Sequence, residues 1–368
     1  MNATPSKCLT LLFLAFNLIA SAFAQENPMQ FMSRANAKVA RAESLKNRWE
    51  GPVAGPKLQK KKKIIFIAAD MSDAAIGALF NGVKEAGIAG AWETLSIDCR
   101  GRCNQGAAII SQALDMKADG IILAGIDVST QAKGLAAADK AKVPVVGWHA
   151  SIKSGPVGGL FTNITSNPKE VAQVAALYMV VEADSKAGIV LFTDSSNPYL
   201  QAKSATILET IKQCESCRLL SVEDVPLADG YVKMKTAVEA AVKRHGAKWT
   251  HVIAVNDFYF DLLTTASIAP LVAANKLIGV SAGDGSPSAY QRIRSNGMQS
   301  GTVPEPLVMH AWQLVDELNR AFCGQAASSY VTPVHLVTVQ NIAYDGGNKN
   351  AFDPANDYRL HYQQSWLK

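Results

Sequence analysis

Short apolar runs, each followed by a polar loop and then by an amphipathic stretch, recur along most of the chain. The clearest unit is 63–86, where the apolar run 64–69 is followed by Asp70-Met71-Ser72-Asp73 and a helical pattern over 74–86. An unbroken apolar run is typical of a strand that is buried on both faces of a parallel sheet. Asp73 can cap the helix, because its carboxylate can accept the free N–H groups of the first turn. The unit is therefore predicted to be strand, polar loop and helix.

The alternation repeats in two series. The first adds predicted strands at 92–97, 120–124 and 143–148 and helices at 104–116 and 129–140. The second has strands at 188–192, 219–222, 251–255 and 277–281 and helices at 168–183, 199–214, 230–245, 260–273 and 287–295. A strand at 298–303, a helix at 306–323 and a strand at 334–339 follow, before an Asn- and Asp-rich tail.

Two series of βα units predict an α/β protein with two Rossmann-like lobes, each built on a parallel sheet and joined by a hinge. A single (β/α)₈ barrel is the competing topology, since it needs a similar number of units. The interruption over 155–168, where loop residues precede an Asn-Pro helix start, favours two lobes.

The pattern divides the chain into a few parts. Residues 1–24 are predicted to be a signal peptide, and 25–62 an extension with helical composition and a Gly/Pro linker. Lobe 1 is expected at 63–162, completed by about 305–338, and lobe 2 at 163–304, completed by about 339–368.

The first residues carry an export signal. Lys7 precedes an apolar stretch that reaches Ile19, and Ala22-Phe23-Ala24 fits the small-x-small cleavage pattern, so that Gln25 would begin the mature chain. The stretch is too short to span a bilayer. We therefore expect a soluble protein in the periplasm.

Composition supports a globular protein without a nucleic-acid partner. The chain has 368 residues, of which 48% are hydrophobic and 18% charged, and its net charge is a modest +5. The run Lys60–Lys63 accounts for part of this charge and is interpreted as a solvated lead-in to the first strand.

The cysteines fall into close pairs. After Cys8 leaves with the signal peptide, Cys99 lies near Cys103 and Cys214 near Cys217. Local disulfides fit an oxidising compartment. A redox CxxC and a four-cysteine zinc site remain alternatives. Cys323 is expected to be a buried free thiol.

Hydrogen-bonding side chains gather just past the predicted strands. They are Asp70, Ser72, Asp73, Asp98, Asp127, Trp148, His149, Thr193, Asp194, Ser195, Asn197, Asn256, Asp257 and Asp284. Ligands of open parallel sheets bind at this edge. Capping of the following helix is the alternative role for Asp73, Asp194 and Asp257. Because no basic side chain is among these residues, they predict a neutral or cationic polar ligand rather than a phosphate or carboxylate.

The layout resembles the sugar-binding proteins of ABC importers, the ribose-binding-like group of type I periplasmic binding proteins, which share their fold with bacterial repressor cores. The resemblance covers roughly 63–340. It is carried by IIFIAADMSDAAIGALFNGVKEA, ADGIILAGID, KVPVVGWHA, HVIAVNDFYF, LIGVSAGDGSP and SGTVPEP. It implies ligand contacts from Asn256 in the "ND" motif, from Asp284 after the "IG" strand, and from Glu305 in place of a hinge glutamine.

Departures from the group argue against ribose as the ligand. Ala75-Ile76 stands where the family often has an aromatic pair, and His149-Ala150 stands where ribose binders have Asp-Arg. The arginine of the middle loop is replaced near Asn197 or Tyr199, and two extra residues precede Asp284.

The resemblance implies a periplasmic substrate-binding protein, not an enzyme, that delivers a sugar or polyol to the membrane permease of an ABC importer. The expected ligand-binding residues are Asp70, Ser72, Asp127, Trp148, His149, Asn197, Tyr199, Asn256, Asp284 and Glu305. A monomer is expected, without a cofactor, a metal or a nucleic-acid partner.

Two alternative functions remain. One is a sensing protein that feeds a chemoreceptor or a sensor kinase. The other is a secreted serine hydrolase, because Gly279-Val280-Ser281-Ala282-Gly283 matches G-x-S-x-G and His335 or His361 could supply a base. The helix is predicted to begin only at Pro287, which is too late for a nucleophile elbow.

Overall fold

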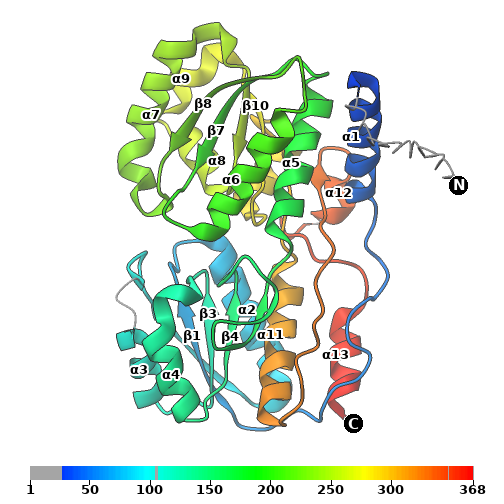
Figure 1. The fold of residues 1–368 in the computed structure, drawn as a ribbon. Coiled ribbons are helices and arrows are strands. Elements are labelled where there is room, and N and C mark those ends of the chain that lie inside the picture. The colour runs from blue at the N-terminus through cyan, green and yellow to red at the C-terminus, as the bar shows by residue number, and fades with distance from the viewer. Residues whose placement is uncertain (1–26, 104–106, 347, 368) are drawn as a thin grey trace, which may run out of the picture.

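The computed structural model describes residues 27–103, 107–346 and 348–367, and it shows two lobes stacked end to end (Figure 1). The predicted signal peptide lies outside these residues. Across the described ranges, no helix is both long and apolar enough to cross a membrane.

The first lobe is built on a six-stranded sheet in the order β2-β1-β3-β4-β6-β5. All neighbouring pairs are parallel except β5 and β6. Its elements are β1 (Lys63–Ala68), α2 (Ala74–Gly87), β2 (Glu93–Asp98), α3 (Ala107–Asp115), β3 (Gly120–Ala124), α4 (Ala132–Lys140), β4 (Val145–Trp148), β5 (Gly155–Val157) and β6 (Leu160–Ile164).

The apolar run of β1 is unbroken because helices cover both faces of this sheet. Ile64 and Phe66 pack on one side in a cluster with residues of α2 and of the late helix α11 (Leu307–Phe322). Ile65 and Ile67 point to the other side, where they meet residues of α3 and α4. Alternate side chains of one strand thus enter two separate cores.

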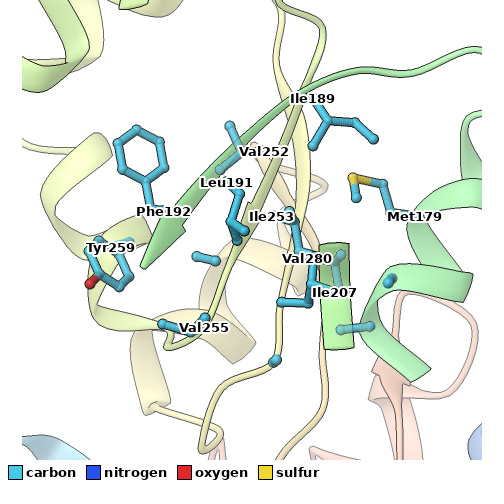
Figure 2. Close-up of a cluster of buried hydrophobic side chains, with 14 of the residues drawn as sticks. Met179, Ile189, Leu191, Phe192, Ile207, Val252, Ile253, Val255, Tyr259 and Val280 are labelled. Atoms are coloured by element: carbon cyan, nitrogen blue, oxygen red, sulfur yellow. The ribbon is translucent and has the colours of Figure 1, made fainter. Parts of the chain in front are cut away.

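The second lobe repeats the plan with the strand order β12-β11-β10-β9-β7-β8. Only β12 runs antiparallel to its neighbour. Its elements are α5 (Pro168–Glu182), β7 (Gly188–Thr193), α6 (Pro198–Ile211), β8 (Arg218–Asp224), α7 (Gly230–His245), β9 (His251–Ala254), α8 (Phe258–Leu263), α9 (Ala269–Val272), β10 (Ile278–Ser281), α10 (Pro287–Arg294), β11 (Gln299–Thr302) and β12 (Val337–Thr338). Figure 2 shows part of its core, with side chains from Met179 on α5 to Tyr259 on α8 around the central strands.

The chain crosses between the lobes within residues 165–167, 303–306 and 323–336. The first two crossings directly follow β6 and β11, at the carboxyl edges of the two sheets. These edges therefore face each other across the hinge, so that residues at the strand ends of both lobes meet. The predicted fold class is confirmed, and two separate sheets exclude the barrel.

Both ends of the described chain also bridge the lobes (Figure 1). The extension begins with α1 (Pro28–Glu43), whose Phe31, Ala35 and Val39 pack in the core of lobe 2. It then reaches lobe 1, where Arg320 Nη2 of α11 donates to the carbonyl of Ala54 at 2.6 Å. Sequence reasoning gave this extension no role, and in the structure it links the two lobes.

The tail corrects the expected lobe boundaries. Residues 339–368 were expected to complete lobe 2, and α12 (Ile342–Asp345) does pack there, next to α10. The last helix, α13 (Tyr358–Leu367), instead packs on lobe 1, where Trp366 stacks on Trp312 of α11 with ring centroids 5.4 Å apart. The aromatic residues Tyr358, Tyr362 and Trp366 recur every four positions and form the buried face of α13.

Three local expectations were also wrong. Residues 260–273 were expected to form one helix that Pro270 kinks or ends. They form α8 and α9, and Pro270 lies in the first turn of α9. Residues 155–164, expected to be a loop and a connecting segment, form β5 and β6. The late strand expected to complete lobe 1 is the two-residue β12, and it lies in the sheet of lobe 2.

The structure pairs Cys99 with Cys103 and Cys214 with Cys217 as disulfides, as predicted. The first bridge closes a loop after β2, and the second closes the turn between α6 and β8. Cys323 is free, as expected, but it is half-buried rather than buried.

We predict that the exported protein carries two intrachain disulfides and one free thiol. Alkylation under non-reducing, denaturing conditions should add one alkyl group to the intact mass, and alkylation after reduction should add five. Three or more groups added without reduction would contradict this pairing.

Candidate functional site

Buried polar side chains from both lobes and from the hinge meet where the two sheets face each other. Trp148 and His149 come from the end of β4, Tyr199 and Lys203 from α6, Asn256 and Asp284 from the loops after β9 and β10, and Glu305 from the crossover before α11. The first two belong to lobe 1 and the next four to lobe 2. We refer to these residues as the cleft cluster.

Glu305 is the acid at the hinge, and 2% of its surface is exposed. Its Oε2 accepts a 2.6 Å hydrogen bond from Ser166 Oγ, which lies in the other crossover, and its Oε1 lies 3.4 Å from His149 Nε2. Burial alone would raise the pKa of Glu305, but the neighbouring His149 and His310 rings and the Ser166 hydroxyl outweigh it and lower the pKa to about 2. A carboxylate is therefore held at the junction of the lobes.

His149 makes the direct contact between the lobes. Its ring stacks on Trp148 on one side, at 3.8 Å between centroids, and on Tyr199 of lobe 2 on the other, at 4.4 Å. Its Nε2 also lies 3.2 Å from the Tyr199 hydroxyl. The backbone of His149 is left-handed (φ 50°), a conformation that few residues other than glycine adopt. The ring thus fills the space between the two lobes.

Trp148, one of the expected ligand-binding residues, is covered in this structure. One per cent of its surface is exposed, and its Nε1 donates to His310 Nδ1 at 3.2 Å. Since an indole N–H can only donate, His310 Nδ1 must accept, and His310 Nε2 carries the proton toward Thr332 Oγ1 at 2.8 Å. Burial also lowers the pKa of His310 to about 4, which agrees with a neutral ring.

Asp284 is held by two side chains of its own lobe. Its Oδ2 accepts from Asn256 Nδ2 at 3.1 Å, and its Oδ1 lies 3.5 Å from Lys203 Nζ. The Lys203 ammonium also donates to the main-chain carbonyls of Ala282, at 2.5 Å, and Val255, at 3.4 Å.

The presence of Lys203 corrects the expectation that no basic side chain lies among the cleft residues. Lys203 was missed because it does not follow a strand but lies in the middle of α6. The signal was its position three residues after Leu200 and four before Ile207, on the apolar face of that helix.

Two carboxylate oxygens of the cleft cluster have no hydrogen-bond partner among the described residues. They are Asp284 Oδ1 and Glu305 Oε1, and both are buried. One ligand atom each of His149, Asp284 and Glu305 lie within 4.8 Å of one another. Buried acceptors without donors are rare in native structures and call for an explanation.

Asp73 of lobe 1 faces the same region. It caps α2, accepting from the Ala75 N–H at 2.8 Å, as the sequence predicted. Burial and the carboxylates of Asp284 and Asp257 raise the pKa of Asp73 to about 7. The acids of both lobes therefore repel one another across the cleft.

The remaining predicted ligand residues form local hydrogen bonds at the strand ends. Asp70 Oδ1 accepts from the N–H and the hydroxyl of Ser72, at 2.8 and 2.6 Å. Asp127 accepts from the Ser129 N–H at 2.9 Å, and Asn197 caps α6 by accepting from the Tyr199 N–H at 2.9 Å. These bonds explain why such residues follow strands. Contact of these four residues with a ligand remains a prediction.

Ser281 does not have the surroundings of a catalytic serine. It is fully buried, its hydroxyl donates to Asp257, and it lies 3.0 Å from Thr302 Oγ1. The two proposed bases have other partners. His335 Nε2 lies 2.9 Å from Asp345 Oδ2, and the His361 ring stacks on Trp49 at 5.2 Å. The G-x-S-x-G match therefore reflects a structural serine.

Comparison with known proteins identifies the fold. A family model described as "periplasmic binding protein domain" matches residues 64–326. No curated protein matches the sequence significantly.

Several solved structures have the same fold at low sequence identity. A sugar ABC transporter protein from Yersinia enterocolitica has a TM-score of 0.69 and 16% identity, covering 83% of this chain and 96% of its own. A solute-binding protein from Burkholderia graminis in complex with D-arabinose has a TM-score of 0.67 and 15% identity, with coverages of 78% and 99%. One from Mycobacterium smegmatis with bound glycerol has a TM-score of 0.66 and 17% identity, with coverages of 79% and 99%.

We predict that Asp73 makes the protein less stable as the pH rises. Because its folded pKa of about 7 exceeds its ordinary value of 3.8, the folded protein holds a proton between these values that the unfolded chain releases. Asp73→Asn keeps a capping side chain but cannot ionise. It should therefore match the wild type near pH 4 and be more stable by about 1–2 kcal/mol at pH 8, after allowance for solvent contact.

Thermal melts of both proteins from pH 4 to pH 8 test this. Asn27→Ala, which removes a capping side chain that cannot ionise and lies outside the cleft cluster, should change the melting temperature by the same amount at every pH. Parallel pH profiles for Asp73→Asn and the wild type would contradict the prediction.

Proposed function

Because this chain belongs to the periplasmic binding protein family, we propose that it is the substrate-binding component of an ABC importer and that it binds a small neutral polyol or monosaccharide in the cleft cluster. The family is made up of solute-binding proteins that are not enzymes. In this proposal the mature chain acts in the periplasm as a monomer and presents its closed form to a membrane permease.

Two buried oxygens support the proposal, Asp284 Oδ1 and Glu305 Oε1. Neither accepts a hydrogen bond within the described residues, and each has one long ion-pair contact, to Lys203 Nζ at 3.5 Å and to His149 Nε2 at 3.4 Å. An ionised carboxylate can only accept hydrogen bonds, so these atoms need a donor. A buried polar atom without a partner costs about 1–3 kcal/mol, and more when it is charged. Hydroxyl groups of a polyol supply donors without adding charge, and they would satisfy both oxygens when the lobes close.

The ligands of structurally similar proteins support this class of compound. The structures named above contain D-arabinose and glycerol, and similar proteins from Agrobacterium vitis and Actinobacillus succinogenes contain allitol and D-allose. Their sequence identity to this chain is too low to transfer any single ligand. The variety of these ligands is what we expect of a cleft that binds hydroxyl groups in general rather than one particular sugar.

Lys203 does not turn the cleft into an anion site. An ammonium group has three protons to donate, and Lys203 directs them to two carbonyls and to Asp284. An incoming phosphate or carboxylate would meet the charges of Asp284 and Glu305 without a spare cation. An amine is the competing ligand, since carboxylates attract a positive charge.

Ligand binding is coupled to the partner through closure of the lobes. Tyr199 of lobe 2 contacts His149 of lobe 1, and both lie beside the hinge residue Glu305. A ligand held by both lobes favours the closed form, which is the form a permease would recognise. A chemoreceptor or sensor kinase could read the same closed form, and crosslinking the liganded protein to its membrane partner distinguishes the two functions.

We predict that polyols or monosaccharides raise the melting temperature of the mature protein. A ligand at a hundred times its Kd, bound only to the folded state, adds about 2.7 kcal/mol to the free energy of unfolding. Asp284→Ala should abolish the shift, since a lost hydrogen bond to a charged group costs about 1.5–3 kcal/mol. The measurement is a thermal-shift screen of sugars, polyols, amines and amino acids on both proteins.

Glu239→Ala provides the matched control, because it removes an exposed carboxylate that pairs with Lys235 on α7. This variant should keep the full ligand shift. Amines that shift the melt while sugars do not would refute the sugar assignment. A phosphate or carboxylate ligand would show that the cleft residues are wrongly placed.

A further inference from the structure

The cleft cluster combines ligand types that proteins use to bind transition metals. His149 offers an imidazole nitrogen, and Asp284 and Glu305 offer carboxylate oxygens, with one atom from each residue within 4.8 Å of the others. Both acids are buried, with 8% of Asp284 and 2% of Glu305 exposed, and each has one carboxylate oxygen that accepts no hydrogen bond within the described residues. Buried carboxylates are stable only when they are paired or coordinate a cation.

From this arrangement we infer that the cleft binds a divalent transition cation, with Zn²⁺ or Mn²⁺ as the fitting class, through His149 Nε2, Asp284 and Glu305. The inference deepens the proposed function and rests on the same cleft. The cation would bridge lobe 1, lobe 2 and the hinge, and the positions that the protein leaves open would take water or ligand hydroxyl groups. One imidazole with two carboxylates suits these metals better than Mg²⁺ or Ca²⁺, which bind oxygen ligands.

The distances require only a small contraction. Ligand atoms at the usual 2.0–2.2 Å from Zn²⁺ lie about 3.4 Å apart in a tetrahedral site. The observed limit of 4.8 Å is about 1.4 Å longer, so each pair of ligand atoms has to approach by at most about 1.4 Å on binding. Because the ligands come from different parts of the fold, this contraction is a slight further closure of the lobes.

The charges around the site favour a cation. The carboxylates of Asp73, Asp257, Asp284 and Glu305 lie close enough to interact with one another or with the same neighbours, and Lys203 opposes them with one positive charge. Asp257 is stabilised by donors of its own, among them the N–H groups of Gly285 and Ser286. The negative charge that remains faces the gap between the lobes.

Tyr199 is the competitor of the cation. Its hydroxyl lies 3.2 Å from His149 Nε2, the nitrogen that a cation would need. The Tyr199 ring also stacks on His149 and helps to orient it. Tyr199→Phe keeps the stack and removes the competing hydroxyl, so it should bind the metal at least as tightly as the wild type.

The test is calorimetric titration of the EDTA-treated, dialysed mature protein with ZnCl₂ or MnCl₂ at pH 7. We expect one saturable site per chain. His149→Ala and Glu305→Gln should each lose at least tenfold in affinity, whereas Tyr199→Phe should retain it. His245→Ala removes a histidine on α7 outside the cleft cluster and is the control for adventitious binding, so its affinity should match that of the wild type.

X-ray absorption on the unmutated protein loaded with Zn²⁺ provides a second measurement that does not depend on the folding of variants. It should show one imidazole nitrogen among oxygen ligands. The absence of a saturable site, equal affinity in His149→Ala and the wild type, or a coordination shell without imidazole would overturn the inference. A polyol shift that persists in EDTA while the metal fails to bind would overturn it too, and would leave the proposed function standing.

Discussion

The burial of one carboxylate at the hinge governs how the two lobes meet. Glu305 lies in the crossover between β11 and α11, and its position away from water requires donors nearby. The hydroxyl of Ser166, in the other crossover, donates to the Glu305 carboxylate, and Nε2 of His149 in lobe 1 lies 3.4 Å from it. The stacking of His149 between Trp148 and Tyr199 then places the α6 face of lobe 2 against lobe 1.

The burial of Glu305 also determines which hydrogen-bonding groups the cleft offers to a ligand. Ser166 donates to one oxygen of Glu305, whereas the other oxygen accepts no hydrogen bond within the described residues and lies 3.4 Å from His149 Nε2. Asp284 Oδ1 likewise accepts no hydrogen bond within the described residues and lies 3.5 Å from Lys203 Nζ. A small ligand rich in donors, with or without a bridging cation, completes a network that the protein alone leaves open. The extension and the tail each connect the lobes as well, so movement at the hinge must also be accommodated by residues 44–53 and 348–357.

Local patterns predicted the strands and helices that build the lobes, because runs such as 64–68 and 188–193 have to be apolar on both faces of a covered sheet. They also predicted that polar residues at the strand ends would include Asn256, Asp284 and His149. Lys203 and His310 were missed because both lie within helices rather than after strands, and only the fold reveals what a buried polar residue of a helix faces. The docking of α1 on lobe 2 and of α13 on lobe 1 depends on contacts between distant parts of the chain. Such contacts cannot be predicted from the local pattern of apolar and polar residues.

We propose that the gap between Asp284 and Glu305 is the ligand site of this two-lobed protein. A crystal structure of the mature protein, grown with the compound that gives the largest thermal shift, tests it most directly. We expect density for the compound between the lobes, within hydrogen-bond distance of both carboxylates. Density confined to another site, such as the roughly 320 Å³ cavity lined by Lys46, Tyr330 and Phe352 behind the hinge, would contradict it.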